Sequence, residues 1–277
     1  MEIMDIIKEA FIFPSEDIGK LAIYIVLTIV TGFLAVGGIV STALGFLDTS
    51  AYAVVGIILF IIALIIGFII SGYQISLIKS GINQSDAPEF EWKKNIIDGI
   101  YCLIISIVYF IIPAIVVMIV GWITNVPGNF QAVVQDAVMS SVNATAAANT
   151  TVPAVSTVSS ALMGNLITSL AITGVVAFIL FIIFAFIHTM AQSRLANTGS
   201  LGEALNIPES FKDIGRIGWG KVIAVILLVV IIVVVINAII SFIANYVPAI
   251  GIVSMIVTPY LIFFAYRAMG LLYSDIA

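Results

Sequence analysis

Residues 52–78, YAVVGIILFIIALIIGFIISGYQISLI, decide the fold because the stretch contains no charged residue and no proline. About twenty apolar residues are enough to cross a bilayer as a helix. Hydrocarbon offers no partner to a free backbone amide or carbonyl, so a spanning segment must satisfy its hydrogen bonds internally. This stretch therefore predicts a membrane-spanning helix.

Five further stretches have the same character, and only the last contains a formal charge, Arg267. The chain is 62% apolar and 9% charged, whereas soluble domains carry about 25% charged residues. We therefore predict an all-α, polytopic integral membrane protein with six transmembrane helices in one transmembrane domain, residues 1–277. The expected spans are Leu21 to Phe46, Tyr52 to Ile78, Gly99 to Ile123, Ala161 to Ile187, Val222 to Asn245 and Ala249 to Gly270.

The basic residues predict the orientation of these spans. All ten fall on one side of the predicted membrane, and short loops rich in Lys and Arg stay in the cytoplasm. We therefore expect a cell-membrane protein with both termini cytoplasmic. The ten are Lys8, Lys20, Lys79, Lys93, Lys94, Arg194, Lys212, Arg216, Lys221 and Arg267.

Three segments on the predicted cytoplasmic side resemble one another: EAFIFPSEDIGKLAI (9–23), SDAPEFEWKKNIIDGIY (85–101) and EALNIPESFKDIGRIGWGKVI (203–223). Each has a proline, a nearby acidic residue and then an Asp close to a Gly, and each precedes a predicted hairpin. The chain thus divides into three internal units, roughly 1–80, 81–192 and 193–277. Because proline favours the first turn of a helix, we expect each segment to form an interfacial helix on the bilayer surface.

The runs IKSGINQSDAPEFEWKKNIIDGIYCLIISIVYFIIPAIV (78–116) and AQSRLANTGSLGEALNIPESFKDIGRIGWGKV (191–222) carry a wider resemblance. They resemble a prokaryotic, largely archaeal family of multi-span membrane proteins, classed as domain of unknown function 4013. The resemblance implies a membrane protein of an archaeon or bacterium. It implies no active site that could be transferred to residues of this chain.

The repeated segments also supply the first candidate site. Their acidic residues either fix the angles at which the hairpins enter the membrane, or they form a docking surface for a membrane or cytoplasmic protein, or for a second copy of the chain. Docking predicts a non-enzymatic scaffold or accessory subunit. The formal charge of this side is negative, so strong attraction to anionic lipid is not expected. The candidate docking residues are Asp17, Glu89, Asp98, Glu209 and Asp213.

Two prolines near the middle of predicted spans supply an alternative site. A proline inside a helix removes a backbone hydrogen bond, and broken helices can mark the midplane site of a transporter. Membrane helices also carry purely structural kinks. The alternative function is a transporter or channel for an uncharged small solute or a lipid, and its candidate residues are Tyr109, Pro113, Thr173, Thr258, Pro259 and Tyr260.

The connection at 125–160 is expected on the extracytoplasmic side, either as a flexible loop or as a short helix near Gln131 to Val142. It contains two sequons, at Asn143 and Asn149, which are candidate N-glycosylation sites.

The remaining function classes find no support in the sequence. One cysteine, Cys102, and one histidine, His188, cannot build a Cys-rich or His-rich metal site, and no phosphate-binding or nucleophile motif is present. We expect no enzymatic activity, no metal and no cofactor. The net charge of −5 argues against a nucleic-acid partner. Arg267 is expected to reach the membrane interface with its long side chain.

Overall fold

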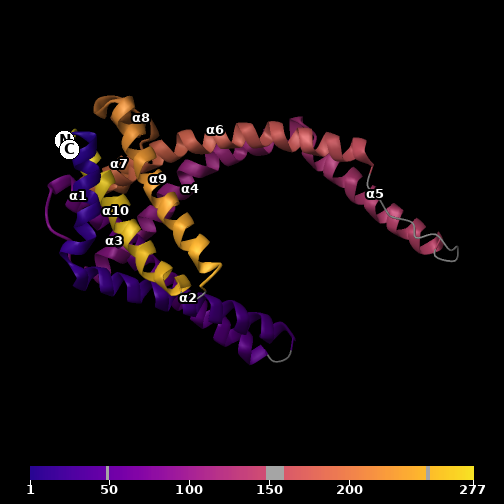
Figure 1. Cartoon of the computed structure of the whole chain (residues 1–277), viewed down its shortest axis with the longest axis horizontal. Coiled ribbons are helices and arrows are strands. Elements are labelled where there is room, and N and C mark those ends of the chain that lie inside the picture. Colours follow the sequence, from indigo (N-terminus) through magenta and orange to yellow (C-terminus); the bar gives the residue numbers. More distant parts are fainter. Residues whose placement is uncertain (48–49, 148–158, 248–249) are drawn as a thin grey trace. The chain divides into compact units, whose positions relative to one another are not determined.

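The computed structural model describes residues 1–47, 50–147, 159–247 and 250–277, without the side chains of 143–147. Every regular element in these ranges is a helix (Figure 1). The helices are α1 (Ile3–Glu16), α2 (Ile18–Leu47), α3 (Ser50–Asn83), α4 (Trp92–Ile123), α5 (Val126–Ala147), α6 (Ser160–Thr198), α7 (Leu201–Ala204), α8 (Ile207–Ile217), α9 (Trp219–Ala244) and α10 (Gly251–Tyr273).

Six of these helices, α2, α3, α4, α6, α9 and α10, are long and apolar enough to cross a membrane. They coincide with the six predicted spans, so the expected all-α, six-span architecture is confirmed. The largest differences are at polar ends: α4 already begins at Trp92, and α6 continues to Thr198. An apolar run marks only the part of a helix inside hydrocarbon, whereas the backbone hydrogen bonds continue into water.

The helices form two compact units. The first contains Met1–Ser106 and Ile187–Ala277, and the second contains Ile107–Phe186. The division into three sequence units, 1–80, 81–192 and 193–277, stays a prediction.

The first unit has an aromatic core. Tyr24 of α2, Tyr73 of α3 and Phe263 of α10 are fully or almost fully buried. The rings of Tyr24 and Phe263 meet edge to face, with centroids 5.2 Å apart. Phe90 stacks on Tyr73 at 3.9 Å, with the two ring planes 2° apart. The core thus joins three spanning helices to the segment between α3 and α4.

Two glycines allow α3 and α10 to cross at backbone contact. A Cβ atom on Gly270 would overlap the carbonyl oxygen of Ile78, and one on Gly81 would lie 2.7 Å from the carbonyl oxygen of Arg267. Association of helices in lipid depends on close packing rather than on the hydrophobic effect, so small residues at a crossing are favoured. The crossing therefore has no room for a larger side chain.

We predict that Gly270→Ala destabilises the protein, because the added methyl group must push two backbones apart. Overpacking of this kind costs about 1–3 kcal/mol, which should appear as a lower melting temperature of the detergent-solubilised protein. Gly67→Ala, also in α3, is the matched control because a Cβ there meets nothing within 4 Å. Equal melting temperatures for the two variants would contradict the close backbone contact between α3 and α10.

The three similar segments, 9–23, 85–101 and 203–223, differ more in structure than in sequence. Only α8 begins as predicted, with Pro208 in its first turn and the Asn206 side chain accepting a hydrogen bond from the Glu209 backbone N–H. Pro14 lies inside α1, near its end, and Pro88 lies in the non-helical segment 84–91. The prediction of a proline-started helix was wrong at these two prolines. A proline in the last turn has no N–H for the carbonyl four residues earlier, so Pro14 favours the end of α1 rather than its start, and 84–91 is held by side chains instead.

The second unit is built on the parts of α4 and α6 that fall within Ile107–Phe186, with α5 between them in sequence. The expected short helix near Gln131 to Val142 is present but longer, since α5 covers Val126–Ala147. It is tied to α6 by Asn129, which donates to Ser169 Oγ at 3.2 Å. Asp136 also accepts a hydrogen bond from the Ser159 backbone N–H at 2.8 Å. These polar contacts stabilise a helix that the Ala-rich and Thr-rich composition left ambiguous.

Candidate functional site

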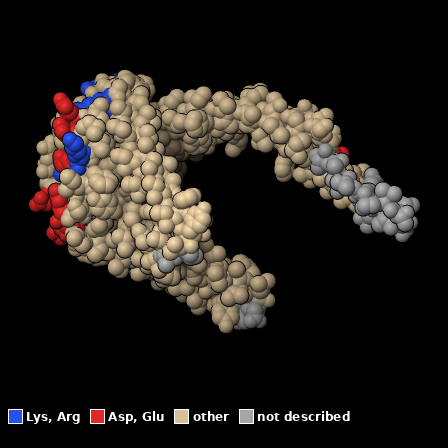
Figure 2. All heavy atoms as spheres, in the orientation of Figure 1, with Lys and Arg blue, Asp and Glu red and all other residues tan. Residues whose placement is uncertain are grey.

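Charged side chains gather at one end of the first unit (Figure 2). We call this region the polar end: it consists of α1, the segment 84–91, α7, α8, residues 274–277 and the adjoining ends of the spanning helices. Lys221 bonds Asp275 at this end, and the N-terminal ammonium of Met1 lies 3.1 Å from the same carboxylate. The two ends of the chain therefore meet here.

Arg267 of α10 is the centre of the polar end. Its side chain is 5% exposed and lies 2.6 Å from the Glu9 carboxylate of α1. The guanidinium also donates to the Ser85 carbonyl at 2.6 Å and to Ser80 Oγ at 3.2 Å. The Phe13 ring covers it, with the guanidinium carbon 4.1 Å from the ring centroid. α1 covers the Arg267 side chain, and Glu9 supplies the countercharge; that Arg267 reaches the membrane interface stays a prediction.

A second buried charge, Asp213 of α8, joins α6, α8 and α10. Its side chain is 1% exposed and lies 2.8 Å from both Arg194 and Arg216. It also accepts a hydrogen bond from the Tyr273 hydroxyl at 2.9 Å. Arg194 in turn pairs with Glu203 of α7 at 2.8 Å. A carboxylate with three donors is well compensated for its loss of water.

The segment 84–91 has no helix, yet its backbone is held at three positions. Side chains from α10, α2 and α3 each donate a hydrogen bond to one of its carbonyl groups, and Phe90 inserts into the aromatic core. The three bonds run from Arg267 Nη1 to Ser85 O (2.6 Å), from Lys20 Nζ to Ala87 O (2.5 Å) and from the Tyr73 hydroxyl to Pro88 O (3.0 Å).

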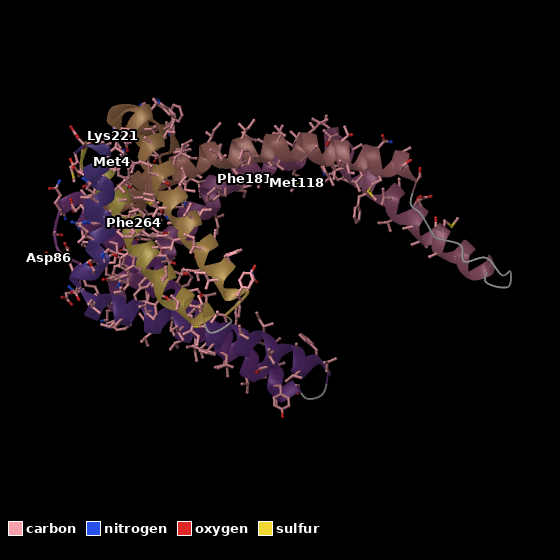
Figure 3. The ribbon with its side chains drawn as sticks, viewed as in Figure 1. Met4, Asp86, Met118, Phe181, Lys221 and Phe264 are labelled. Carbon is pink, nitrogen blue, oxygen red and sulfur yellow. The ribbon has the colours of Figure 1, made fainter. Side chains whose placement is uncertain are left out.

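The acidic side chains of this segment remain at the surface. Asp86 is exposed and lies at the edge of the molecule in Figure 3. The side chain of Glu89 is 84% exposed although it pairs with Lys20, and that of Glu91 is 62% exposed. Sequence reasoning selected Glu89 and missed the other two. Their common signal, three carboxylates within six residues around a proline, is visible in the sequence.

The remaining docking candidates are placed differently. Asp17 pairs with Lys20 at 3.2 Å, and Glu209 pairs with Lys212 at 2.7 Å. Asp98 is half-buried in α4, beside a small cavity that Lys79 also lines. Asp213 is buried and cannot meet a partner directly. The five residues therefore do not form one open surface, and most of them brace the polar end.

Three acidic groups outside the spanning segments have lowered pKa values. A hydrogen bond from the Lys212 ammonium lowers the pKa of Glu209, and the backbone N–H and ammonium of Lys20 lower that of Asp17. Burial raises the pKa of Asp275, but hydrogen bonds from Lys221 and the N-terminal ammonium outweigh burial and lower it. In their charged form, all three carboxylates therefore stabilise the folded state.

The six midplane candidates are divided between the two units. Tyr109, Pro113 and Thr173 belong to the second unit; Thr258, Pro259 and Tyr260 belong to the first. Two of the hydroxyl groups already have partners. Thr173 bonds Thr124 at 2.9 Å, and Tyr260 donates to the Phe11 carbonyl at 2.6 Å. Transport at these residues stays a prediction.

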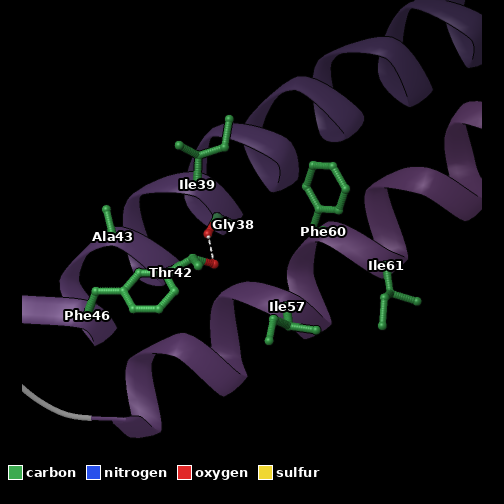
Figure 4. A pocket seen from close by; sticks show the side chains of 8 residues that line it. All are labelled: Gly38, Ile39, Thr42, Ala43, Phe46, Ile57, Phe60 and Ile61. Carbon is green, nitrogen blue, oxygen red and sulfur yellow. Dashed lines mark hydrogen bonds between the residues drawn. The ribbon is translucent and has the colours of Figure 1, made fainter.

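Two apolar grooves lie along α2. One, of about 500 Å³, runs between α2 and α3 (Figure 4). Its single hydroxyl, Thr42, donates to the Gly38 carbonyl at 2.8 Å. The other, of about 450 Å³, lies between α2 and α10 and includes Thr258 and Pro259. Apolar grooves on spanning helices suit lipid chains, so neither shows a specific ligand.

The remaining sequence predictions concern metals and glycosylation. Within the described ranges, no group of three His, Cys, Asp or Glu side chains is placed to hold a metal ion. Asn143 falls near the end of α5, where side chains are not described, and Asn149 lies outside the described residues.

Six apolar helices that end in a charged, internally braced surface define a polytopic membrane-spanning protein. The family model described as "Protein of unknown function (DUF4013)" matches residues 55–245. The chain belongs to this family, which confirms the resemblance, although the match runs from α3 to the end of α9 rather than over nearly the whole chain. No curated protein and no solved structure matches the chain.

We predict that Glu9→Gln destabilises the protein by about 1.5–3 kcal/mol, because it leaves the buried Arg267 guanidinium without its countercharge. Thermal unfolding in detergent measures the loss. Lys212→Gln is the control: it breaks an ion pair whose Lys212 side chain is 60% exposed, and exposed pairs contribute about 0–1 kcal/mol. If the melting temperature of Glu9→Gln is no lower than that of Lys212→Gln, burial of Arg267 does not depend on the Glu9 charge.

We also predict that the polar end loosens in acid. Carboxyl groups with lowered folded-state pKa values stabilise the folded state above their unfolded values, about 3.9 for Asp and 4.3 for Glu. That contribution is lost as the pH falls from these values through the folded-state pKa values. Melting temperature should thus be nearly constant from pH 8 to 5 and fall below about pH 4. Asp275→Asn should make the decrease in melting temperature below pH 4 smaller. An unchanged dependence of melting temperature on pH would contradict the pairing of Asp275 with Lys221 and the N-terminal ammonium.

Proposed function

We propose that this protein is a non-enzymatic membrane scaffold or accessory subunit that binds the basic segment of another protein at the polar end. The observation that supports the proposal is the construction of segment 84–91. Three backbone carbonyl groups are held from within, while the carboxylates of Asp86, Glu89 and Glu91 stay exposed.

A surface that is ordered before binding loses less conformational entropy on association. An unsupported loop of eight residues would have to be ordered by its partner. Here Arg267, Lys20 and Tyr73 have already fixed the backbone, and the stacked ring of Phe90 anchors its end. The carboxylates of Asp86, Glu89 and Glu91 suit a partner that carries Lys or Arg at similar spacing. Complementary charges align the partner on the segment and accelerate association.

The orientation belongs to the same proposal. With the basic residues at the polar end, the positive-inside rule places this end, and both chain termini, in the cytoplasm. A partner would then be a cytoplasmic protein, the cytoplasmic face of another membrane protein or a second copy of the chain. We further propose a cell-membrane location in an archaeon or bacterium, as the family resemblance implies.

The test is photo-crosslinking in native membranes. A crosslinking amino acid at residue 86 should capture one polypeptide, whereas the same probe at Tyr52, which is 50% exposed at the far end of α3, should not. In a probe-bearing chain, Glu89→Gln together with Glu91→Gln should lower the captured amount about tenfold, and added salt should lower it further.

The matched control is Glu2→Gln with Asp5→Asn, which makes the same change in charge at exposed positions of the α1 start. It should lower capture less than twofold. Equal capture by both double variants would contradict docking at segment 84–91, and so would capture of the same polypeptide from residue 52.

A further inference from the structure

A polar crevice lies between α3, α4, α6 and α10 of the first unit, beside the polar end. Its volume is about 570 Å³, which is within the range of small-molecule sites. Ser106, its lining residue farthest along α4, lies about 10 Å from Gly99, where the apolar run of this span begins, whereas Gln192 lies beyond the apolar run of α6. The polar lining comes from Ser71 and Gln74 of α3, Cys102 and Ser106 of α4, His188 and Gln192 of α6, and Tyr266 of α10.

Part of this lining is already bonded. Ser106 Oγ donates to the Cys102 carbonyl at 2.8 Å and lies 3.0 Å from His188 Nε2. Gln74 Nε2 donates to the Tyr24 hydroxyl at 2.8 Å, which directs its amide oxygen away from that bond.

Other polar groups face the crevice without a partner in the described part of the chain. The Ser71 hydroxyl, the Gln192 amide and the Tyr266 hydroxyl make no side-chain hydrogen bond to another described residue. In hydrocarbon an unpaired polar group costs several kcal/mol. Three such groups from three helices converge on one hollow and are available to a hydrogen-bonding ligand.

The lining also indicates the charge of that occupant. Among the described residues around the crevice, none is Asp, Glu, Lys or Arg, and His188 is the only titratable base. A formally charged ligand would have no counterion there and would pay a large desolvation cost. Hydroxyl and amide groups match hydroxyl groups of a neutral ligand, since each side can both donate and accept.

The apolar part of the lining points to a lipid. Leu64 and Leu103 are both 46% exposed, and on spanning helices such side chains contact acyl chains. We propose that the crevice binds the uncharged, hydroxyl-bearing headgroup of a neutral lipid, whose chain lies along Leu64 and Leu103. The same hydroxyl chemistry in a free polyol is the competing source, and the experiment separates the two.

The test is native mass spectrometry of the full chain, released from phosphatidylcholine nanodiscs with either monoolein or glycerol added. Monoolein has two headgroup hydroxyls and one acyl chain, so we expect it to bind in a 1:1 ratio while glycerol does not. Gln192→Met with Tyr266→Phe removes two hydrogen-bonding groups with little change in volume and should weaken monoolein binding about tenfold or more. Tyr266→Phe alone, which deletes one oxygen, should weaken it several-fold if the double variant fails to fold.

Ser254→Ala with Thr258→Val is the control, because it removes two hydroxyl groups from the apolar groove between α2 and α10. Monoolein affinity should be unchanged in it. Equal affinity in the crevice and control variants would overturn the proposal, as would no binding of either compound. Glycerol binding that only the crevice variants lose would overturn the lipid assignment in favour of a free polyol.

Discussion

The contact between Arg267 and Glu9 is the interaction on which the described first unit depends. An arginine near the end of a spanning helix can usually extend to water, but here α1 lies over it and supplies the countercharge. The same guanidinium reaches Ser80 of α3 and the carbonyl of Ser85. One side chain thus joins the N-terminal helix, two spanning helices and the segment that carries the proposed docking surface.

The spanning helices depend on such polar contacts because their solvent is lipid. Lipid chains are as apolar as Leu or Ile side chains, so burying them against each other gains little, and most apolar residues of the spans face outward. Specific association must come from close backbone contact and from polar bonds. The structure uses the Gly81 and Gly270 crossing for the first, and the buried charges Arg267 and Asp213 for the second. Both are close to the polar end, where the spans are bound together.

Much of the fold could be predicted from sequence because each spanning helix satisfies its own backbone, and an apolar run alone therefore locates it. The ends of α4 and α6 could not be predicted, because helical hydrogen bonding continues past the apolar run. The three similar segments that contain a proline show a second limit of prediction from sequence. Pro14, Pro88 and Pro208 have similar neighbours, yet one lies inside a helix, one in a non-helical segment and one in a first turn, since tertiary partners decide the outcome.

The candidate sites show the same limit. Composition indicated that charge concentrates at one end, but burial separates Asp213 from Glu89, and no pattern along the chain reveals that difference. The crevice was missed because its polar groups are one or two residues on each of four helices, and each is typical of ordinary helix contacts. Only the packing of α3, α4, α6 and α10 brings Gln74, His188 and Tyr266 to one hollow.

The most direct test of the account is a distance measurement between spin labels at Met4 of α1 and Asp86, in a chain whose single cysteine is replaced by Cys102→Ala. Both positions are exposed and are labelled in Figure 3. With Arg267 present, the account predicts one narrow distance distribution, because α1 and segment 84–91 are bonded to the same guanidinium. Arg267→Met should broaden it while the six spans remain helical. A distribution that stays equally narrow without Arg267 would contradict the claim that this residue holds the polar end together.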